Sequence, residues 1–447
     1  MRKNKGKGML VAMLLCIAAL VSAVVSVQAT ATTQVTVTKY AANNYSTVVN
    51  STTLNYSQMN ASLTVYGDGI TDYFHQGPIF TDEWNSSNCP IYEDWTDEQC
   101  YGDHSGMGDY DVWDRNETMN FKTKGSPKGT DIKDLCEQVG GMSLGDEIQV
   151  HANDNLKKWF NYTNVYNNRA NETLNNMQGR MVLTWYAYDN YTGTPDYYSG
   201  MRLVFFANTT THVNTTCGEN DLYVFGDWDM HECLAPWYWY YYYRAGVLYP
   251  STNGLSVKYV DQLNIYPPHL HDFNTTGDTT GWAFGNETDE SPGANDPNTE
   301  FDSTAYNNIT DDDGTFQSDV TTADDNYAAH RFNFSIDTST AKDGPIADIE
   351  MLNITWNGKG WHDNGDAANG TSLYIWNGTG YEELANNSGD GTEVYLTGEI
   401  TSGISNYVSA TNNVTVLVKQ KSAQELEAAS HIATDYVKLV VTHHHHN

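Results

Sequence analysis

From Arg331 onward the chain is a series of short strand patterns separated by turn residues, and this stretch shows no helical period. Apolar and aromatic residues alternate with polar ones in these segments, which suits strands with one buried face. A sheet of such strands needs a second layer to cover its apolar side. We therefore expect residues 327–442 to form an antiparallel β-sandwich, with strands over 331–336, 349–356, 371–376, 414–418 and 434–441 and turns at Asn357, Asn364 and Asn377.

The preceding residues 66–271 have a mixed pattern, which predicts an α+β domain. Thr130 is the expected N-cap of a helix over 131–139, and strands are expected over 146–151, 181–186, 201–206, 222–225 and 255–260. Residues 30–65 read as an N-terminal β segment. Residues 272–326 are rich in Asp, Asn, Gly and Thr, so they form either an acidic linker or the loop-rich start of the sandwich. The fold class is thus β-rich with two domains.

The N-terminus has the features of an export signal. Residues 1–8 are basic, residues 9–27 are almost wholly apolar, and Ala29 offers a small residue for cleavage. We expect a signal peptide over residues 1–29, with an uncleaved anchor as the alternative. No later stretch reaches the roughly 18 apolar residues that a membrane helix needs. The sequence therefore predicts an extracellular protein of the cell surface, without a transmembrane anchor after cleavage.

Twenty Asn-X-Ser/Thr sequons support this address and predict a glycoprotein. They lie at Asn44, Asn50, Asn55, Asn60, Asn85, Asn116, Asn161, Asn171, Asn190, Asn208, Asn214, Asn274, Asn286, Asn308, Asn333, Asn353, Asn369, Asn377, Asn386 and Asn413.

The net charge of −33 excludes nucleic acid as a main partner, because like charges repel. Disorder is also a poor fit, since 12 Trp, 31 Tyr and 13 Phe can bury a large apolar area. Packing such acidic chains side by side would require high salt or bound divalent cations such as Ca²⁺.

Five cysteines follow the predicted signal peptide. The short spacings predict the disulfides Cys89–Cys100 and Cys217–Cys233. Cys136 falls on the predicted helix and is expected to be a buried apolar thiol. Its pairing with Cys233 stays open, because connectivity does not follow from sequence.

Two groups of residues are candidates for metal binding. Asp311, Asp313 and Asp319 place oxygen ligands around Gly314, as calcium loops do, although the closing Glu is missing. Asp103, Asp109 and Asp111 form a second, weaker acidic cluster. His231 and His75 are candidate ligands for a transition metal if they converge in space, but burial for packing is favoured for such histidines. The His-rich tail, residues 443–447, is either a native chelating segment or the remnant of a tag, and we assign it no function.

No catalytic motif is present: the chain lacks Gly-X-Ser-X-Gly, His-Glu-X-X-His and a Gly-rich phosphate loop. We therefore expect no enzymatic activity. The run Trp237–Tyr243 contains seven consecutive aromatic residues. If it forms a strand, the outward rings can stack on sugars or on a neighbouring subunit, and the inward rings fill the core.

Several segments resemble exported cell-envelope proteins of methanogenic archaea, including surface-layer and sheath-type coats. They are residues 63–69, 73–78, 128–142, 200–207 and 224–233. The first unit is also faintly similar to the molybdopterin-binding domain of sulfite-oxidase-like enzymes. That similarity would imply Cys136 as a thiolate ligand and Lys128, Lys133, Arg180 or Arg202 near a pterin phosphate. The C-terminal stretch, from Asp343 to its close at residues 434–439, resembles jelly-roll domains of archaeal surfaces.

Together these features predict a structural glycoprotein of an archaeal surface coat, whose copies associate laterally with divalent cations. Its partners would be copies of itself, other envelope proteins or glycans. The alternatives are a monomeric carbohydrate-binding surface protein and, third, a secreted metal or molybdopterin oxidoreductase.

Overall fold

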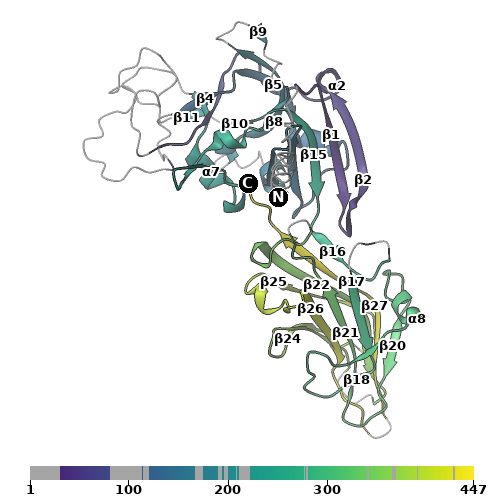
Figure 1. Ribbon diagram of the computed structural model, residues 1–447. Helices are drawn as coiled ribbons and strands as arrows, with labels where there is room; N and C mark the ends of the chain where they lie inside the picture. The colour runs from purple at the N-terminus through teal and green to yellow at the C-terminus, as the bar shows by residue number, and fades with distance from the viewer. Residues whose placement is uncertain are drawn as a thin grey trace, which may run out of the picture.

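The computed structural model describes residues 31–80, 113, 120–166, 175–189, 194–195, 200–207, 209–210, 222–275, 277, 280–339, 342–364, 369–389, 391–425 and 428–447. The predicted signal peptide, Cys89, Cys100, Cys217 and the cluster of Asp103, Asp109 and Asp111 lie outside these residues. Two β-rich domains lie end to end, the first purple to teal and the second green to yellow (Figure 1). The fold class expected from the sequence is confirmed.

The main sheet of the first domain has the order β2-β1-β15-β6-β7. Its strands are β1 (Gln34–Ala41), β2 (Asn44–Asn55), β6 (Glu147–Ala152), β7 (Lys157–Asn161) and β15 (Val260–Tyr266). β1 pairs with β15 in parallel, and the other pairs are antiparallel. The segment 30–65 is therefore an integral part of this domain, because β1 and β2 complete a sheet whose other strands come from residues 147–266.

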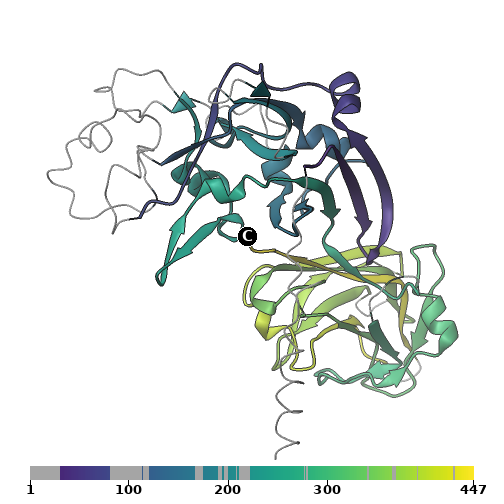
Figure 2. The ribbon, with the colours of Figure 1, turned by 45° about the horizontal axis from the view of Figure 1, so that its top comes forward.

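Three smaller sheets accompany the main one. The first contains β10 (Arg202–Phe206), β8 (Arg180–Asp189) and β5 (Ser126–Asp131), with β9 (Thr194–Pro195) on β8. The second contains β11 (Thr209–Thr210), β12 (Leu222–Phe225), β3 (Tyr73–Gln76) and β4 (Phe121–Thr123). The third is a hairpin of β13 (Tyr241–Arg244) and β14 (Val247–Pro250), which Figure 2 shows extending from the body of the domain.

Short helices pack around these sheets: α2 (Tyr56–Ser62), α4 (Ile132–Glu137), α5 (Tyr162–Tyr166), α6 (Asn175–Gln178), α7 (Asp227–Cys233), η3 (Pro236–Tyr238) and η4 (Thr252–Leu255). The predicted helix is α4, and its N-cap is Asp131 rather than Thr130, because the Asp131 side chain accepts a hydrogen bond from the Lys133 amide. The strand expected over 255–260 is wrong for most of its length. Leu255 ends the 3₁₀ helix η4, and β15 begins only at Val260.

The second domain is a sandwich of two antiparallel sheets. The first sheet has the order β16-β27-β22-β25, with β20 also on β27: β16 (His269–His271), β20 (Gln317–Val320), β22 (Ile349–His362), β25 (Val394–Ile400) and β27 (Ser430–His443). The second has the order β19-β17-β21-β26-β23-β24, with β18 on β21: β17 (Thr280–Gly285), β18 (Glu287–Thr288), β19 (Thr299–Glu300), β21 (Tyr327–Ser335), β23 (Thr371–Trp376), β24 (Tyr381–Asn386) and β26 (Asn413–Gln420). α8 (Ser303–Asn307), η5 (Ile346–Asp348) and η6 (Ile404–Asn406) connect strands. Phe332, Trp356 and Val416 lie in the fully buried core between the sheets.

Residues 272–326 form the start of the sandwich, since they supply β17, β18, β19, α8 and β20. The turn predicted at Asn357 is wrong. Asn357 lies in the middle of the long strand β22, where the pairing with β27 shifts register between Asn357 and Gly358. A bulge of this kind uses a small residue where the backbone of a neighbouring strand comes close.

Two connections join the domains. The chain passes directly from β15 to β16, and the Leu270 amide donates to the Ala42 carbonyl at 2.8 Å. Beyond β27 the C-terminal segment returns to the first domain, so the C-terminus lies at the junction (Figure 1). There His445 stacks on Trp159 at 3.6 Å between ring centroids. The tail is therefore an ordered part of the junction.

Among the described residues, no helix is long and apolar enough to cross a membrane.

Candidate functional site

Three carboxylates meet beside the paired strands β22 and β27 of the sandwich. Asp312 comes from the loop after α8, Glu393 precedes β25, and Asp435 lies on β27; their oxygens lie within 4.8 Å of one another. Asn357 lies on β22 opposite a bulge in β27 whose extra residue is Asp435. Asn357 reaches all three carboxylates: its Nδ2 lies 2.7 Å from Asp312 Oδ1, 2.7 Å from Glu393 Oε1 and 3.2 Å from Asp435 Oδ2. The bulge thus places the side-chain amide of Asn357 next to the three carboxylates.

The amide of Asn357 does not satisfy this cluster. Its NH₂ group has two hydrogens for three carboxylates, while its Oδ1 is buried without a hydrogen-bond partner. Rotating the amide by 180° would turn Oδ1 toward Asp312, Glu393 and Asp435. An amide oxygen and three carboxylates form a ligand set that suits Ca²⁺.

The protonation of the carboxylates reflects their proximity. Burial and the neighbouring Asp312 raise the pKa of Asp435. At Asp312, burial works in the same direction, but hydrogen bonds from Tyr395 and Asn357 outweigh it and lower the pKa. A divalent cation would relieve this repulsion, because it favours the charged form of every carboxylate it binds.

The three aspartates predicted to bind calcium contact different partners in the structure, and their side chains do not form one group of possible metal ligands. Asp311 accepts a hydrogen bond from Asn274 at 3.2 Å, and Asp313 accepts one from the Thr315 amide at 2.9 Å. Asp319 faces the buried ring of His330, with Oδ2 at 3.2 Å from Nε2. The structure therefore gathers Asp312 with Glu393 and Asp435 instead of the three predicted residues. The acidic loop around the predicted residues supplies Asp312, but Glu393 and Asp435 are too distant in sequence to be recognised with it.

His75 and His231 are not brought together with other metal-binding side chains in the described parts of the chain. His75 is fully buried; its Nδ1 lies 3.2 Å from the Thr252 carbonyl and its Nε2 accepts from the Phe205 amide. Both ring nitrogens of His75 therefore have partners within the buried interior of the first domain. His231 stacks on Trp228 and contacts its neighbour Glu232 at 3.0 Å.

Cys136 is buried in the first domain and forms no disulfide, as expected for an apolar thiol. Burial raises its pKa, followed by the charges of Asp131 and Glu137, so the neutral thiol is favoured over a thiolate. The basic side chains that the resemblance would place near a pterin phosphate have other contacts. Arg180 pairs with Asp131 at 2.9 Å, and the amines of Lys128 and Lys133 lie over tyrosine rings. The predicted pairs Cys89–Cys100 and Cys217–Cys233 involve undescribed residues and stay predictions.

None of the sequon asparagines that the structure describes is buried. Asn85, Asn116, Asn171, Asn190, Asn208 and Asn214 lie outside the described residues. Glycosylation itself stays a prediction.

The aromatic run is not one strand. Pro236–Tyr238 forms η3, and only Tyr241 and the following residues enter the β13–β14 hairpin. Tyr238 is fully buried, whereas Tyr243 is 68% exposed. Tyr243 pairs with Leu248, which is 56% exposed, so their side chains form an apolar surface on one face of the hairpin. Tyr242 and Val247 add exposed apolar area on the other face.

A second surface with aromatic rings is the outer face of the seven-stranded sheet. Trp282 is 41% exposed on β17 and pairs with Asn333 on β21. On the same face, Trp376 packs edge-to-face against Tyr381 at 5.1 Å, and the Arg331 guanidinium lies 3.9 Å from the centroid of the Phe284 ring.

A protein-family model described as "Uncharacterized protein, C-terminal domain" matches residues 278–443, which cover the sandwich from β17 to β27. No curated protein matches the chain. Among solved structures, the CBM22-1 xylan-binding domain of Paenibacillus barcinonensis Xyn10C is similar, with 13% identity, a TM-score of 0.19, and coverage of 39% of this chain and 94% of that domain. The tandem CBM22-1-CBM22-2 domain of the same protein has 12% identity, a TM-score of 0.17, and coverage of 30% and 42%. At these TM-scores the similarity to carbohydrate-binding modules is weak.

Proposed function

We propose that this protein is a structural component of a cell-surface coat and that its copies associate through the β13–β14 hairpin. The observation that carries the proposal is the exposed apolar surface of the hairpin, formed by Tyr242, Tyr243, Val247 and Leu248. Exposed clusters of large apolar side chains mark interaction sites, because leaving them in water forgoes the free energy gained by burial.

The distribution of negative charge favours a second copy of this chain as the partner of the hairpin. The molecule carries a net charge of −33, so most of its surface repels an identical chain. Residues 233–260, which include the hairpin, contain no Asp or Glu. The hairpin is thus a place where two copies approach with little repulsion.

Glycans would not block this contact either. No sequon falls between Asn214 and Asn274, so the hairpin carries no attachment site. In addition, β13 pairs only with β14 among the described strands. Strand edges of this kind can pair with the same hairpin of another copy.

The test is the oligomeric state of the full-length mature protein at rising concentration, measured by analytical ultracentrifugation with and without Ca²⁺. We expect concentration-dependent association that the double substitution Tyr243→Ser and Leu248→Ser weakens by at least about 10-fold, since it removes apolar area worth a few kcal/mol.

The matched control is Ile70→Ser with Leu144→Ser, which changes two side chains that are each 81% exposed away from the hairpin. The control should associate like the unmodified chain. A protein that stays monomeric at every concentration, or equal losses in both variants, would overturn the proposal.

A second candidate function is carbohydrate binding by the outer face of the seven-stranded sheet, where Trp282 is exposed beside polar Asn333. Aromatic rings flanked by polar groups bind sugars by stacking and hydrogen bonding. Here Trp282→Ala should abolish retention on immobilised polysaccharides, with xylan included, whereas Tyr243→Ser should not. Retention that survives Trp282→Ala and Trp376→Ala would contradict this candidate.

A further inference from the structure

The domain junction contains histidines and carboxylates that the proposed functions do not use. They form two neighbouring groups, in each of which one ligand atom of every residue lies within 4.8 Å of the others. The groups are Glu147 with His443 and His445, and His269 with His271 and Asp343.

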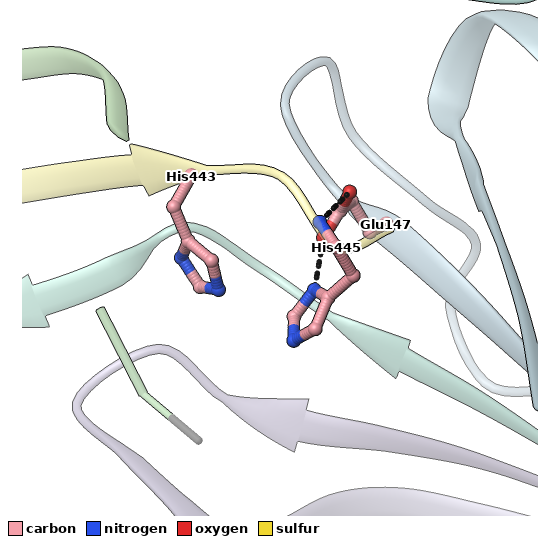
Figure 3. A group of neighbouring side chains, drawn as sticks. All are labelled: Glu147, His443 and His445. Atoms are coloured by element: carbon pink, nitrogen blue, oxygen red, sulfur yellow. Dashed lines mark hydrogen bonds and ion pairs between the residues drawn. The ribbon is translucent and has the colours of Figure 1, made fainter. Parts of the chain in front are cut away.

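The first group is built by strand alternation. His443 ends β27 and the chain continues beyond it, so that His443 and His445 lie on the same side of the segment (Figure 3). His444 instead stacks on Trp237 with centroids 4.9 Å apart, and His446 bonds to Asp348 at 3.0 Å. His443 and His445 thus face each other, with ring centroids 4.7 Å apart, and His444 Nδ1 also lies 3.8 Å from Glu147 Oε1.

The ring nitrogens of His443 are buried without hydrogen-bond partners. Its side chain is buried, with the residue only 6% exposed, yet neither Nδ1 nor Nε2 has a hydrogen-bond partner. Leaving such atoms without partners costs free energy, and buried polar groups in native proteins nearly always have a partner. A bound ion would supply one, because a neutral imidazole nitrogen is a metal ligand.

Glu147 is held ready beside it. Tyr238 donates to its Oε1 at 2.5 Å, and His445 Nδ1 lies 2.6 Å from its Oε2. The carboxylate is thus oriented by groups around it, as ligating carboxylates are.

We propose that Glu147, His443 and His445 bind one divalent first-row transition-metal ion, of which Zn²⁺ is the test case, and that this ion fastens the C-terminal segment to the first domain. Two imidazoles and one carboxylate form a known ligand set for such ions. Glu147 belongs to β6 of the first domain, whereas His443 is the last residue of β27 in the sandwich and His445 lies two residues beyond it. The ion would therefore link the two domains.

The neighbouring group does not carry the same inference. His269 Nδ1 and His271 Nε2 each lie 2.8 Å from Asp343 Oδ1, so each ring already has a partner in the group, and only His271 Nδ1 is buried without one, whereas both nitrogens of His443 are. We propose one ion only.

The experiment titrates metal-free full-length protein with Zn²⁺ against a chromophoric chelator. We expect one tight site per chain. Glu147→Gln, His443→Ala and His445→Ala should each weaken binding by at least about 10-fold, because each removes a direct ligand. Zn²⁺ should also raise the melting temperature of the unmodified chain, an effect that Glu147→Gln should remove.

The control is His446→Ala, since His446 is 56% exposed, bonds to Asp348 and does not belong to the group around Glu147. Four consecutive histidines can chelate without any fold. In that case His446→Ala would weaken binding as much as His443→Ala, and Glu147→Gln would have no effect. Either of these results, or the absence of stoichiometric Zn²⁺ binding, would overturn the proposal, whereas association through the hairpin would be unaffected.

Discussion

Asn447 and Trp159 bind each other through two hydrogen bonds: the Trp159 amide donates to Asn447 Oδ1 at 2.6 Å, and Asn447 Nδ2 donates to the Trp159 carbonyl at 3.0 Å. The side chain of Asn447 thus makes the two hydrogen bonds to the β7 backbone that a neighbouring strand would make. The same Nδ2 reaches the Tyr238 carbonyl at 2.9 Å, so one residue joins two segments of the first domain.

Asn447→Ala should lower the free energy of unfolding by about 1–3 kcal/mol, because it leaves backbone groups of Trp159 and Tyr238 without partners. Urea unfolding of the full chain, followed by tryptophan fluorescence, measures this. His446→Ala removes an exposed pair with Asp348 and should change stability by less than about 0.5 kcal/mol. Equal effects of the two substitutions would show that the tail does not hold the junction.

The buried His75 should make stability depend on pH. Burial and the charge of Lys124 lower its pKa well below 6.5 in the folded state. Below about pH 6.5 the unfolded chain therefore takes up a proton that the folded chain does not, so stability falls as the pH decreases. The contribution has a slope of up to about 1.4 kcal/mol per pH unit. Unfolding curves between pH 5 and 8 should show a slope that is one proton smaller in His75→Gln; an unchanged slope would contradict this assignment.

Ca²⁺ should stabilise the sandwich through Asp312, Glu393 and Asp435. At Ca²⁺ concentrations about 100-fold above the dissociation constant, linkage predicts a gain of about 2.7 kcal/mol. Differential scanning calorimetry should show a rise in melting temperature that Asp435→Asn and Asn357→Ala remove. Asp289→Asn, which changes an acidic residue on an exposed loop, should keep the full rise. A shift that persists in Asp435→Asn would place the cation elsewhere.

Gly358→Ala should disrupt the bulge between β22 and β27, in which Asp435 is the extra residue. A Cβ atom there would lie 2.2 Å from the Ala433 carbonyl oxygen and 2.3 Å from the Trp356 ring, neither of which can move without disturbing the core. We expect a loss of about 1–3 kcal/mol and weaker Ca²⁺ binding, since the bulge positions Asn357. Gly380→Ala is the matched control, because a Cβ atom there would meet nothing within 4 Å. Similar stability of both variants would refute this account.

The sequence predicted much of the fold because hydrophobic alternation is local. The patterns at 371–376 and 434–441 correspond to β23 and to the middle of β27. The turn at Asn357 failed because Asn-Gly looks the same in a hairpin turn and in a bulge. Only the distant carboxylate of Asp435 shows which one occurs here.

The sites were harder to predict, because their members are far apart in the chain. Glu147 and His445 are separated by almost 300 positions, and nothing local marks Glu147 as their meeting point. The alternation of His443 and His445 was visible, and on an extended segment it would have placed both rings on one side. That the tail is ordered at all follows from its packing on Trp159, a tertiary contact.

The position of β27 also limits the order in which the molecule can be completed during synthesis. This strand pairs with β22 along one edge and with β16 and β20 along the other, yet it is made after all three of them. While the ribosome still holds residues 430–443, the first sheet of the sandwich lacks the strand that joins its parts. Until then β16, β20 and β22 expose unpaired edges, which makes a chain stalled before β27 a ready target for aggregation or for chaperones.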